Sequence, residues 1–225
     1  KNPSCNAKMF IHNPEHPNFA YFQASGKPSH NGSCGSIYNH FDNSKYDEKL
    51  FSFPEVLMNL ESKPSGTKPT GKSSPKKGKS TSGGEKALKT IKEIYKMATN
   101  TPPNDSYNGV KIKNILADVR SYSDYKDGID GYHLVECNFY CFDKKEKTII
   151  MNFPFLPNNK YYLRLCFKDE DLFKKEYSRF YDTGHTGIIV ISGLWEKKDE
   201  EYRTKTIKAE CTIKSEKQIA IIKKK

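Results

Sequence analysis

One stretch of 23 residues divides this chain into parts. Residues 62–84, "SKPSGTKPTGKSSPKKGKSTSGG", contain only Lys, Pro, Gly, Ser and Thr. None of these side chains fills an apolar core, and such a composition is typical of a flexible linker. We therefore expect an irregular N-terminal segment with a short helix at 1–61, the linker at 62–84, and a folded domain at 85–225. A linker of this length spans roughly 25–30 Å, so whether the N-terminal segment docks on the domain stays open.

The linker also holds much of the positive charge. The formal net charge is +11, and six of these charges are linker lysines, which leaves +5 for the rest. A basic chain favours nucleic acid or another anionic surface as its partner. Within the linker, Ser74-Pro75-Lys76-Lys77 is similar to the SPKK units of histone tails, which bind DNA, so Lys76 and Lys77 are candidate nucleic-acid contacts. The alternative is a spacer whose lysines only keep it soluble.

Most of the folded domain has the alternation of a β-sheet. The 14 Tyr and 13 Phe favour strands. Side chains that would face one side of a sheet alternate with those of the other side in three stretches: "YHLVECNFYCF" at 132–142, "TIIMNFPF" at 148–155 and "KYYLRLCF" at 160–167. Two further strands, at 188–195 and 202–213, follow a helix over 168–180. We expect the interior side chains of the first three strands to be Val135, Cys137, Phe139, Cys141, Ile149, Met151, Phe153, Phe155, Tyr161, Leu163, Leu165 and Phe167.

Two helices and a strand are expected ahead of this sheet. In "SFPEVLMNLES", Ser52 and Glu55 have capping-box spacing, which predicts a helix over 53–61. The run "GEKALKTIKEIYKMAT" predicts an amphipathic helix over 86–98. Residues 110–119 are expected to form a strand.

The order of three strands, a helix and two strands resembles the OB-fold, a small closed barrel of five strands. The resemblance covers residues 110–213 and rests on the order and length of the elements. It implies a mainly β fold with short helices, in which an OB-like five-stranded barrel is preceded by an amphipathic helix and an irregular N-terminal segment. Another α+β arrangement with the same order is the alternative.

An aromatic and basic surface of the sheet is the main candidate site. If the interior set is right, Tyr140, Phe142, Tyr162 and Arg164 face outwards. Lys144, Lys145 and Lys147 lie in the adjacent turn, and Arg203 and Lys205 lie on the last strand. Aromatic rings stack on unpaired bases while lysines bind phosphates. In the alternative, Tyr140 and Tyr162 pack beneath a neighbouring helix.

Two other groups of residues suggest chemistry less directly. His12, His16, His30 and His40, together with Cys5 and Cys34, offer zinc-ligand types without the spacing of any familiar finger. Cys34 in "NGSCGS" also lies near two histidines in the sequence, and Cys and His are the kinds of residue that a thiol enzyme uses, although proximity in the sequence does not imply proximity in space. Neither pattern is specific, and GxSxG, HExxH and Walker motifs do not occur. We therefore predict no enzyme and no cofactor.

These observations favour a non-enzymatic protein that binds single-stranded DNA or RNA. By resemblance, its setting is a replication, telomere or RNA-processing assembly with other protein subunits. The alternative is an OB-like scaffold for protein–protein interaction, with residues 53–61 docking a partner. The sequence contains no apolar run of 18 residues, so no membrane span is expected, and its start does not resemble a signal peptide. Four of the six Cys lie in strand-like runs, where a free Cys behaves as a small core residue. We expect an intracellular, nuclear location.

Overall fold

A computed structural model describes residues 9–12, 21–24, 41–42, 45–62, 86–155, 159–183 and 187–222. The linker lysines therefore lie outside the described residues. The elements in chain order are β1 (Met9–His12), β2 (Tyr21–Ala24), η3 (Glu48–Leu50), α1 (Phe53–Glu61), α2 (Ile91–Thr99), β3 (Ser106–Tyr107), β4 (Val110–Lys111), α3 (Ile112–Ile115), β5 (Leu116–Ala117), η4 (Val119–Asp124), β6 (Gly131–Asp143), β7 (Thr148–Phe153), β8 (Tyr161–Phe167), α4 (Glu170–Thr183), β9 (Ile188–Tyr202), β10 (Lys205–Ile213), η5 (Glu216–Gln218) and β11 (Ile219–Ile222).

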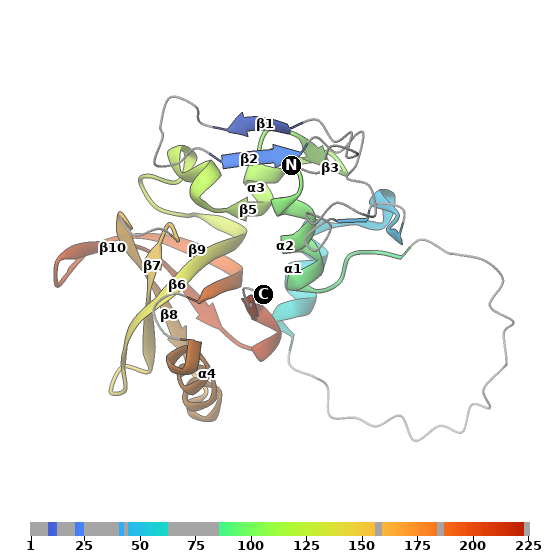
Figure 1. Ribbon diagram of the computed structural model, residues 1–225. Helices are drawn as coiled ribbons and strands as arrows, with labels where there is room; N and C mark the ends of the chain where they lie inside the picture. Colours follow the sequence, from blue (N-terminus) through green and yellow to red (C-terminus); the bar gives the residue numbers. More distant parts are fainter. Residues whose placement is uncertain are drawn as a thin grey trace, which may run out of the picture.

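Five strands close into a ring, called here the five-strand ring (Figure 1). Its order is β6, β7, β8, β10, β9 and back to β6, and each neighbouring pair is antiparallel except β8 with β10. Helix α4 connects β8 to β9, while β5 and β11 extend the sheet beyond the ring. The predicted fold class is confirmed: the protein is mainly β, with short helices and a ring of five strands.

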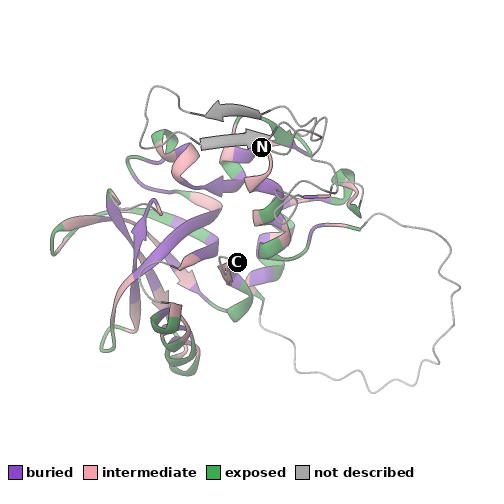
Figure 2. Cartoon of the chain, in the orientation of Figure 1, coloured by how far each residue is buried: buried purple, intermediate pink, exposed green. Residues whose placement is uncertain are grey.

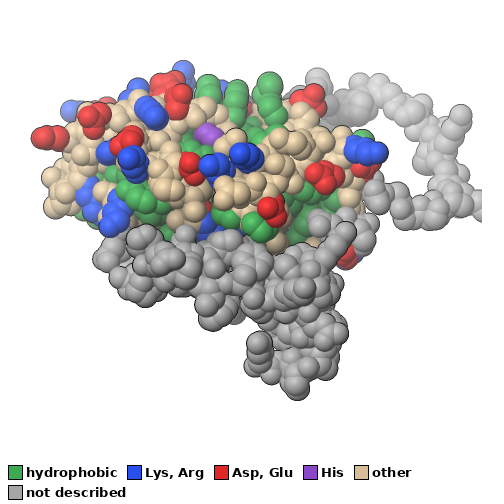
Figure 3. Space-filling model, turned by 90° about the horizontal axis from the view of Figure 1, so that it is seen from above, with side chains coloured by type: hydrophobic (Ala, Val, Ile, Leu, Met, Phe, Trp, Pro, Cys, Tyr) green, Lys and Arg blue, Asp and Glu red, His purple; other side chains and the backbone are tan. Residues whose placement is uncertain are grey.

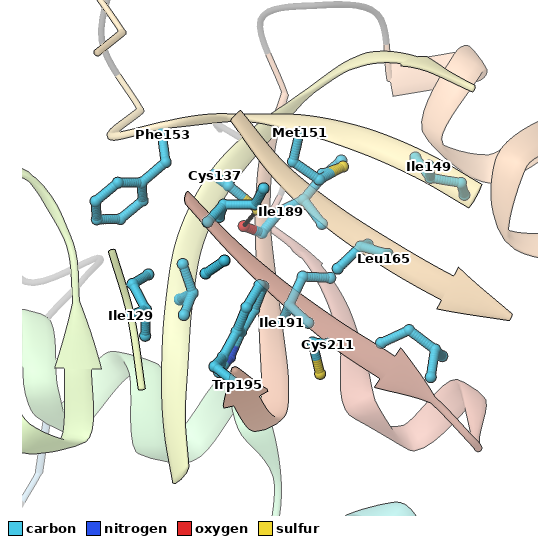
Figure 4. Packing of buried hydrophobic residues seen from close by; sticks show 14 of the residues in the cluster. Ile129, Cys137, Ile149, Met151, Phe153, Leu165, Ile189, Ile191, Trp195 and Cys211 are labelled. Atoms are coloured by element: carbon cyan, nitrogen blue, oxygen red, sulfur yellow. Dashed lines mark hydrogen bonds between the residues drawn. The ribbon is translucent and has the colours of Figure 1, made fainter. Parts of the chain in front are cut away.

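Apolar side chains from every strand fill the interior of the five-strand ring (Figure 4). The predicted alternation holds along β7 and β8, where every second side chain is interior. Trp195 of β9 and Ile129, from the segment before β6, are both fully buried in this cluster. Each large apolar side chain buried in this way contributes about 1.5–3 kcal/mol to folding. The interior is therefore the main source of stability for the ring.

The segment before the linker packs against the outside of the ring. Helix α1 buries Phe53, Leu57 and Leu60 in a second apolar cluster that also contains residues of α2 and of strands β6, β9 and β11. The carboxylate of Glu61 forms an ion pair with Lys214 at 2.6 Å. Figure 2 shows the buried side of α1 and α2 turned toward the sheet. Residues 41–62 therefore share a core with residues that follow the linker.

The helices before the ring differ in detail from those expected. Helix α1 has the predicted bounds, but the Ser52 side chain makes no capping hydrogen bond. Helix α2 begins at Ile91 rather than at 86, because Thr90 and Glu93 form a capping box there. The strand expected over 110–119 is wrong, since that stretch forms β4, α3 and β5 in succession and then enters η4.

A buried ion pair attaches the end of α2 to the ring. The Arg120 Nε atom donates to the Asp118 carboxylate at 2.6 Å, and both side chains are almost fully buried. The Arg120 guanidinium also donates to the carbonyl oxygens of Ala98 and Thr101, at 3.1 and 3.2 Å. Asp118 in turn caps η4. A charged side chain thus donates to carbonyl oxygens at and just beyond the end of α2.

The His133 side chain connects the start of β6 to two segments that precede it in the sequence. Its Nδ1 lies 2.9 Å from the carbonyl oxygen of Asn114, and its Nε2 lies 2.8 Å from that of Asp130. The aromatic ring of Tyr125 contacts the His133 imidazole edge-on, with 5.2 Å between the two ring centroids. Burial lowers the pKa of His133, although the two carbonyl contacts act in the opposite direction.

The shared core predicts a strong contrast between two adjacent residues of α1. Leu57→Ala should lower the free energy of unfolding by about 2–5 kcal/mol, because Leu57 is fully buried. Met58→Ala, at a side chain that is 52% exposed, should change it by less than about 0.5 kcal/mol. Urea unfolding measures both. Equal, small effects would contradict the packing of α1 on the ring.

The lowered pKa of His133 predicts a pH dependence of stability. Below pH 6.5 the unfolded chain takes up a proton at this position before the folded protein does. The stability that neutral His133 provides is complete above pH 6.5 and is lost as the pH falls toward its folded-state pKa. Urea unfolding at pH 8 and 5.5 should show a smaller loss for His133→Gln than for the wild type. Equal losses would show that other groups govern acid stability.

Candidate nucleic-acid interface

A bulge in β6 decides which of its side chains face outwards. Phe139 pairs with Met151, but Cys141 pairs with Ile150, so one extra residue, Tyr140, is inserted. Beyond the bulge the alternation is reversed. Cys141 faces the outside instead of the interior, and the prediction for it was wrong.

Phe142 was expected beside Tyr140, and this too is wrong. It packs against the interior cluster and against Tyr177 of α4, with ring centroids 4.6 Å apart. The Lys144 Nζ atom lies over both rings, 5.7 and 5.6 Å from their centroids. Phe142 and Lys144 therefore form a contact between the β6–β7 hairpin and α4, separate from the outward face that carries Tyr140.

Three tyrosines gather on the outward face and are called here the tyrosine cluster. Tyr140 stacks on Tyr162 with 4.7 Å between ring centroids and 19° between planes. Tyr202 meets Tyr162 edge-on at 5.9 Å. Ile150 and Ile207 lie beneath them in a small apolar cluster. Tyr162 is only 2% exposed, whereas Tyr140 is partly exposed.

The burial of Tyr162 corrects part of the prediction. The residue faces outwards as expected, but Tyr140 and Tyr202 cover it, so its ring is not free to stack on a base. Its hydroxyl lies 3.2 Å from Thr204 Oγ1. Tyr140 and Tyr202 are both partly exposed, and of these two Tyr140 is the one that lies flat on Tyr162.

The hydroxyl groups of the tyrosine cluster differ in acidity. Hydrogen bonds donated by Tyr162 and then by Arg203 lower the pKa of Tyr140. Burial raises the pKa of Tyr162, and it raises that of Tyr202 to about 12. The Tyr202 hydroxyl also contacts Cys141 Sγ at 3.6 Å. Tyr140 is thus the one of these three tyrosines whose pKa is lowered.

Two cations lie directly over these rings. The Arg203 guanidinium is 5.8 Å from the centroid of Tyr140 and 5.5 Å from that of Tyr202. Lys205 Nζ is 5.2 Å from the centroid of Tyr162 and donates to Asn159 at 2.9 Å. Burial lowers the pKa of Lys205, and the charge of nearby Lys160 acts in the same direction. Arg203 and Lys205 thus place two positive charges over the tyrosine cluster, and Lys160 lies close enough to Lys205 to act on its charge.

The remaining predicted residues are less available. Arg164 forms ion pairs with Glu200 and, at 3.4 Å, with Glu210, so its charge is compensated. Lys145 and Lys147 lie in the β6–β7 turn, where the Asp143 carboxylate accepts from the Lys145 amide at 2.9 Å. Lys147 has a φ of 51° and its carbonyl accepts from the Phe167 amide. The turn is thus held by the Asp143 carboxylate and by the end of β8.

Several expectations lie outside the described residues. These are the linker contacts Lys76 and Lys77, and the zinc-ligand and thiol candidates near the N-terminus, whose side chains are not described even where a backbone strand is. In the part of the chain that the structure describes, no three His, Cys, Asp or Glu side chains are grouped so as to hold a metal ion. None of the helices described there is long and apolar enough to cross a membrane.

Charge is balanced over the described residues. They include 26 basic and 25 acidic side chains, a net charge of +1, so most of the +11 lies elsewhere in the chain. Basic and acidic side chains are interspersed on the face shown in Figure 3. A hollow of about 470 Å³ follows the same pattern, because it is lined by Asp127, Lys197, Lys198, Asp199 and Lys208. A strong net positive charge is therefore not a property of the described fold as a whole.

Tyr202 was missed by the sequence analysis. The signal that would have found it is "YRTK" at 202–205, where a Tyr precedes the two cations already singled out at the tip of a hairpin. Comparison with protein-family models, curated proteins and solved structures finds no match for this chain. Function is therefore inferred from the residues themselves.

The geometry predicts different roles for the two stacked rings. Tyr162→Ala should lower the free energy of unfolding by about 3–5 kcal/mol, as expected for a large buried ring. Tyr140→Ala should lower it by less than about 1.5 kcal/mol, because it removes one outer aromatic pair. Thermal or urea unfolding measures the difference. If Tyr140→Ala were the more harmful change, the assignment of inner and outer rings would be reversed.

Proposed function

We propose that the five-strand ring is an OB-like barrel that binds single-stranded nucleic acid without catalysing a reaction. The order of the strands supports this, because the third and fifth strands pair in parallel and a helix precedes the fourth. OB-folds bind oligonucleotides on the face of their second and third strands and on the loops between strands 1 and 2 and between strands 4 and 5. Here those loops are the β6–β7 and β9–β10 hairpins, which project from the side of the ring away from α1 and α2 (Figure 1).

One observation carries the proposal: a partly exposed tyrosine lies flat on its neighbour with cations beside it. Stacking on an aromatic ring contributes about 1–3 kcal/mol per base and tolerates any base, since every base has a π face. Arg203, Lys205 and Lys160 are placed to contact the phosphates on either side of that base. Lys145 and Lys147 extend the same role along the β6–β7 hairpin.

The balanced charge of the fold limits the strength of this site. With a net charge of +1 over the described residues, little long-range attraction comes from the fold as a whole. The lysines of residues 62–84 would supply that attraction and hold the strand near the ring, with Lys76 and Lys77 among them. We place this activity in a nuclear replication, telomere or RNA-processing assembly, which fits a binding module of modest affinity.

The scaffold alternative has less support. It requires residues 53–61 to dock a partner, yet Phe53, Leu57 and Leu60 are buried within the chain itself. The large apolar side chains that the structure describes as exposed are Leu50, Met58, Tyr181 and Leu194, and they lie on four different elements. Specific protein interfaces need a contiguous patch.

The proposal predicts salt-dependent binding of a labelled thymidine strand of about ten nucleotides. The three contacts of Arg203, Lys205 and Lys160, at about −0.7 each, give a slope near −2 for the logarithm of the affinity against that of salt concentration, and contacts of Lys145, Lys147 or the linker make it steeper. Tyr140→Ala should weaken binding by about 1–3 kcal/mol, or roughly 5- to 150-fold. Fluorescence anisotropy across a salt series measures both quantities.

Two controls sharpen this experiment. Tyr181→Ala removes a tyrosine that is 67% exposed on α4 and should leave affinity unchanged. Replacing the six linker lysines by serine keeps the length of the chain, and a smaller slope would assign the linker a binding role. Absence of binding at low salt, or affinity that ignores salt, would refute the proposed function.

A further inference from the structure

The partly exposed ring of Tyr140 already has a planar group, the Arg203 guanidinium, over it. Tyr162 covers one face of Tyr140 at 4.7 Å, so a base could stack only on the opposite face. The Arg203 guanidinium lies over this ring and over that of Tyr202, in the corner between the two. A guanidinium is flat and delocalised, as a nucleobase is. Arg203 thus lies where a stacking base would have to lie.

Arg203 is also placed so that it can leave. Its side chain is exposed, and the contacts given for it among the described residues are with the Tyr140 and Tyr202 rings and the Tyr140 hydroxyl, not with a carboxylate. Its backbone has a φ of 53° at the tip of the β9–β10 hairpin, outside the regular strands. Arg164, by contrast, is fixed by two glutamates. Movement of the Arg203 side chain therefore breaks no ion pair among the described residues.

We propose that Arg203 is an internal competitor for the base-binding face of Tyr140, an inference that rests on the proposed function. An incoming base displaces the guanidinium and stacks on Tyr140, and Arg203 then contacts the adjacent phosphate. The exchange is favourable because an exposed cation–π contact contributes less free energy than a stacked base does. Arg203 keeps the ring covered until a strand is bound and sets how much each base adds to affinity.

Lys205 provides a matched comparison. It is a cation of the same hairpin and also lies over a tyrosine, but that tyrosine is Tyr162, which is buried and has no free face. Loss of Lys205 removes one phosphate contact and leaves Arg203 over Tyr140. Arg203→Ala removes one phosphate contact and uncovers Tyr140, and it exchanges one L-residue for another at the same φ.

The test compares two strands with equal numbers of phosphates, one of thymidine and one abasic, at a fixed low salt concentration. The ratio of their dissociation constants, abasic over thymidine, measures what the bases contribute. It should be above one for the full-length wild type and about two- to fivefold larger for Arg203→Ala, because no cation–π contact must be broken. Lys205→Ala should keep the wild-type ratio, and Tyr140→Ala should bring it close to one.

The outcomes separate the two proposals. If neither strand binds the wild type, the proposed function fails and the competitor role fails with it. If both strands bind but Arg203→Ala leaves the ratio unchanged or lowers it, the function stands and the competitor role is refuted. If Lys205→Ala raises the ratio as much as Arg203→Ala, the effect comes from lost positive charge, and the competitor role is again refuted.

Discussion

The pairing of β9 with β6 is the contact on which the rest of the structure depends. Seven residue pairs, from Gly131 with Trp195 to Cys137 with Ile189, close the five-strand ring. Closure removes the exposed edges that an open sheet would offer to other chains. It also fixes the alternation of β9, which sends Ile189 and Ile191 into the ring and Val190 outwards to the cluster beneath α1 and α2. The distal half of β9 pairs with β10 and carries Tyr202 at its end.

Close packing along β9 leaves little room for variation. At Gly193 a Cβ atom would lie 2.5 Å from Cys211 Sγ, closer than atoms can approach, so a side chain there would force the strands apart. Gln218 lies nearby and donates to the Ser192 carbonyl at 3.0 Å. The strand that closes the ring is thus held on one side by β6 and on the other by β10 and the residues that lead into β11.

The alternation of apolar residues in the sequence was sufficient to predict interior side chains of the five-strand ring. It was insufficient to predict which outward side chains are accessible. The alternation of β7 and β8 identified their interior residues, since a strand buried on one side repeats every two residues. The burial of Tyr162 was not predictable, because Tyr202, 40 positions later, must fold over it. The partners of Arg164 lie 36 and 46 residues away. Local patterns carry no information about such contacts. The partly exposed, stacked side chain of Tyr140 could therefore be recognised only in three dimensions.

The bulge at Tyr140 has a consequence for how this chain is compared with others. Up to position 139 a reading by alternate residues is correct, and from 141 onward the same reading assigns every side chain of β6 to the opposite face. A related chain that lacked the inserted residue would need a one-residue gap here to be aligned correctly. Such a chain would also have no aromatic side chain at this position. The presence of that gap would therefore separate relatives that have the Tyr140 surface from those that keep only the fold.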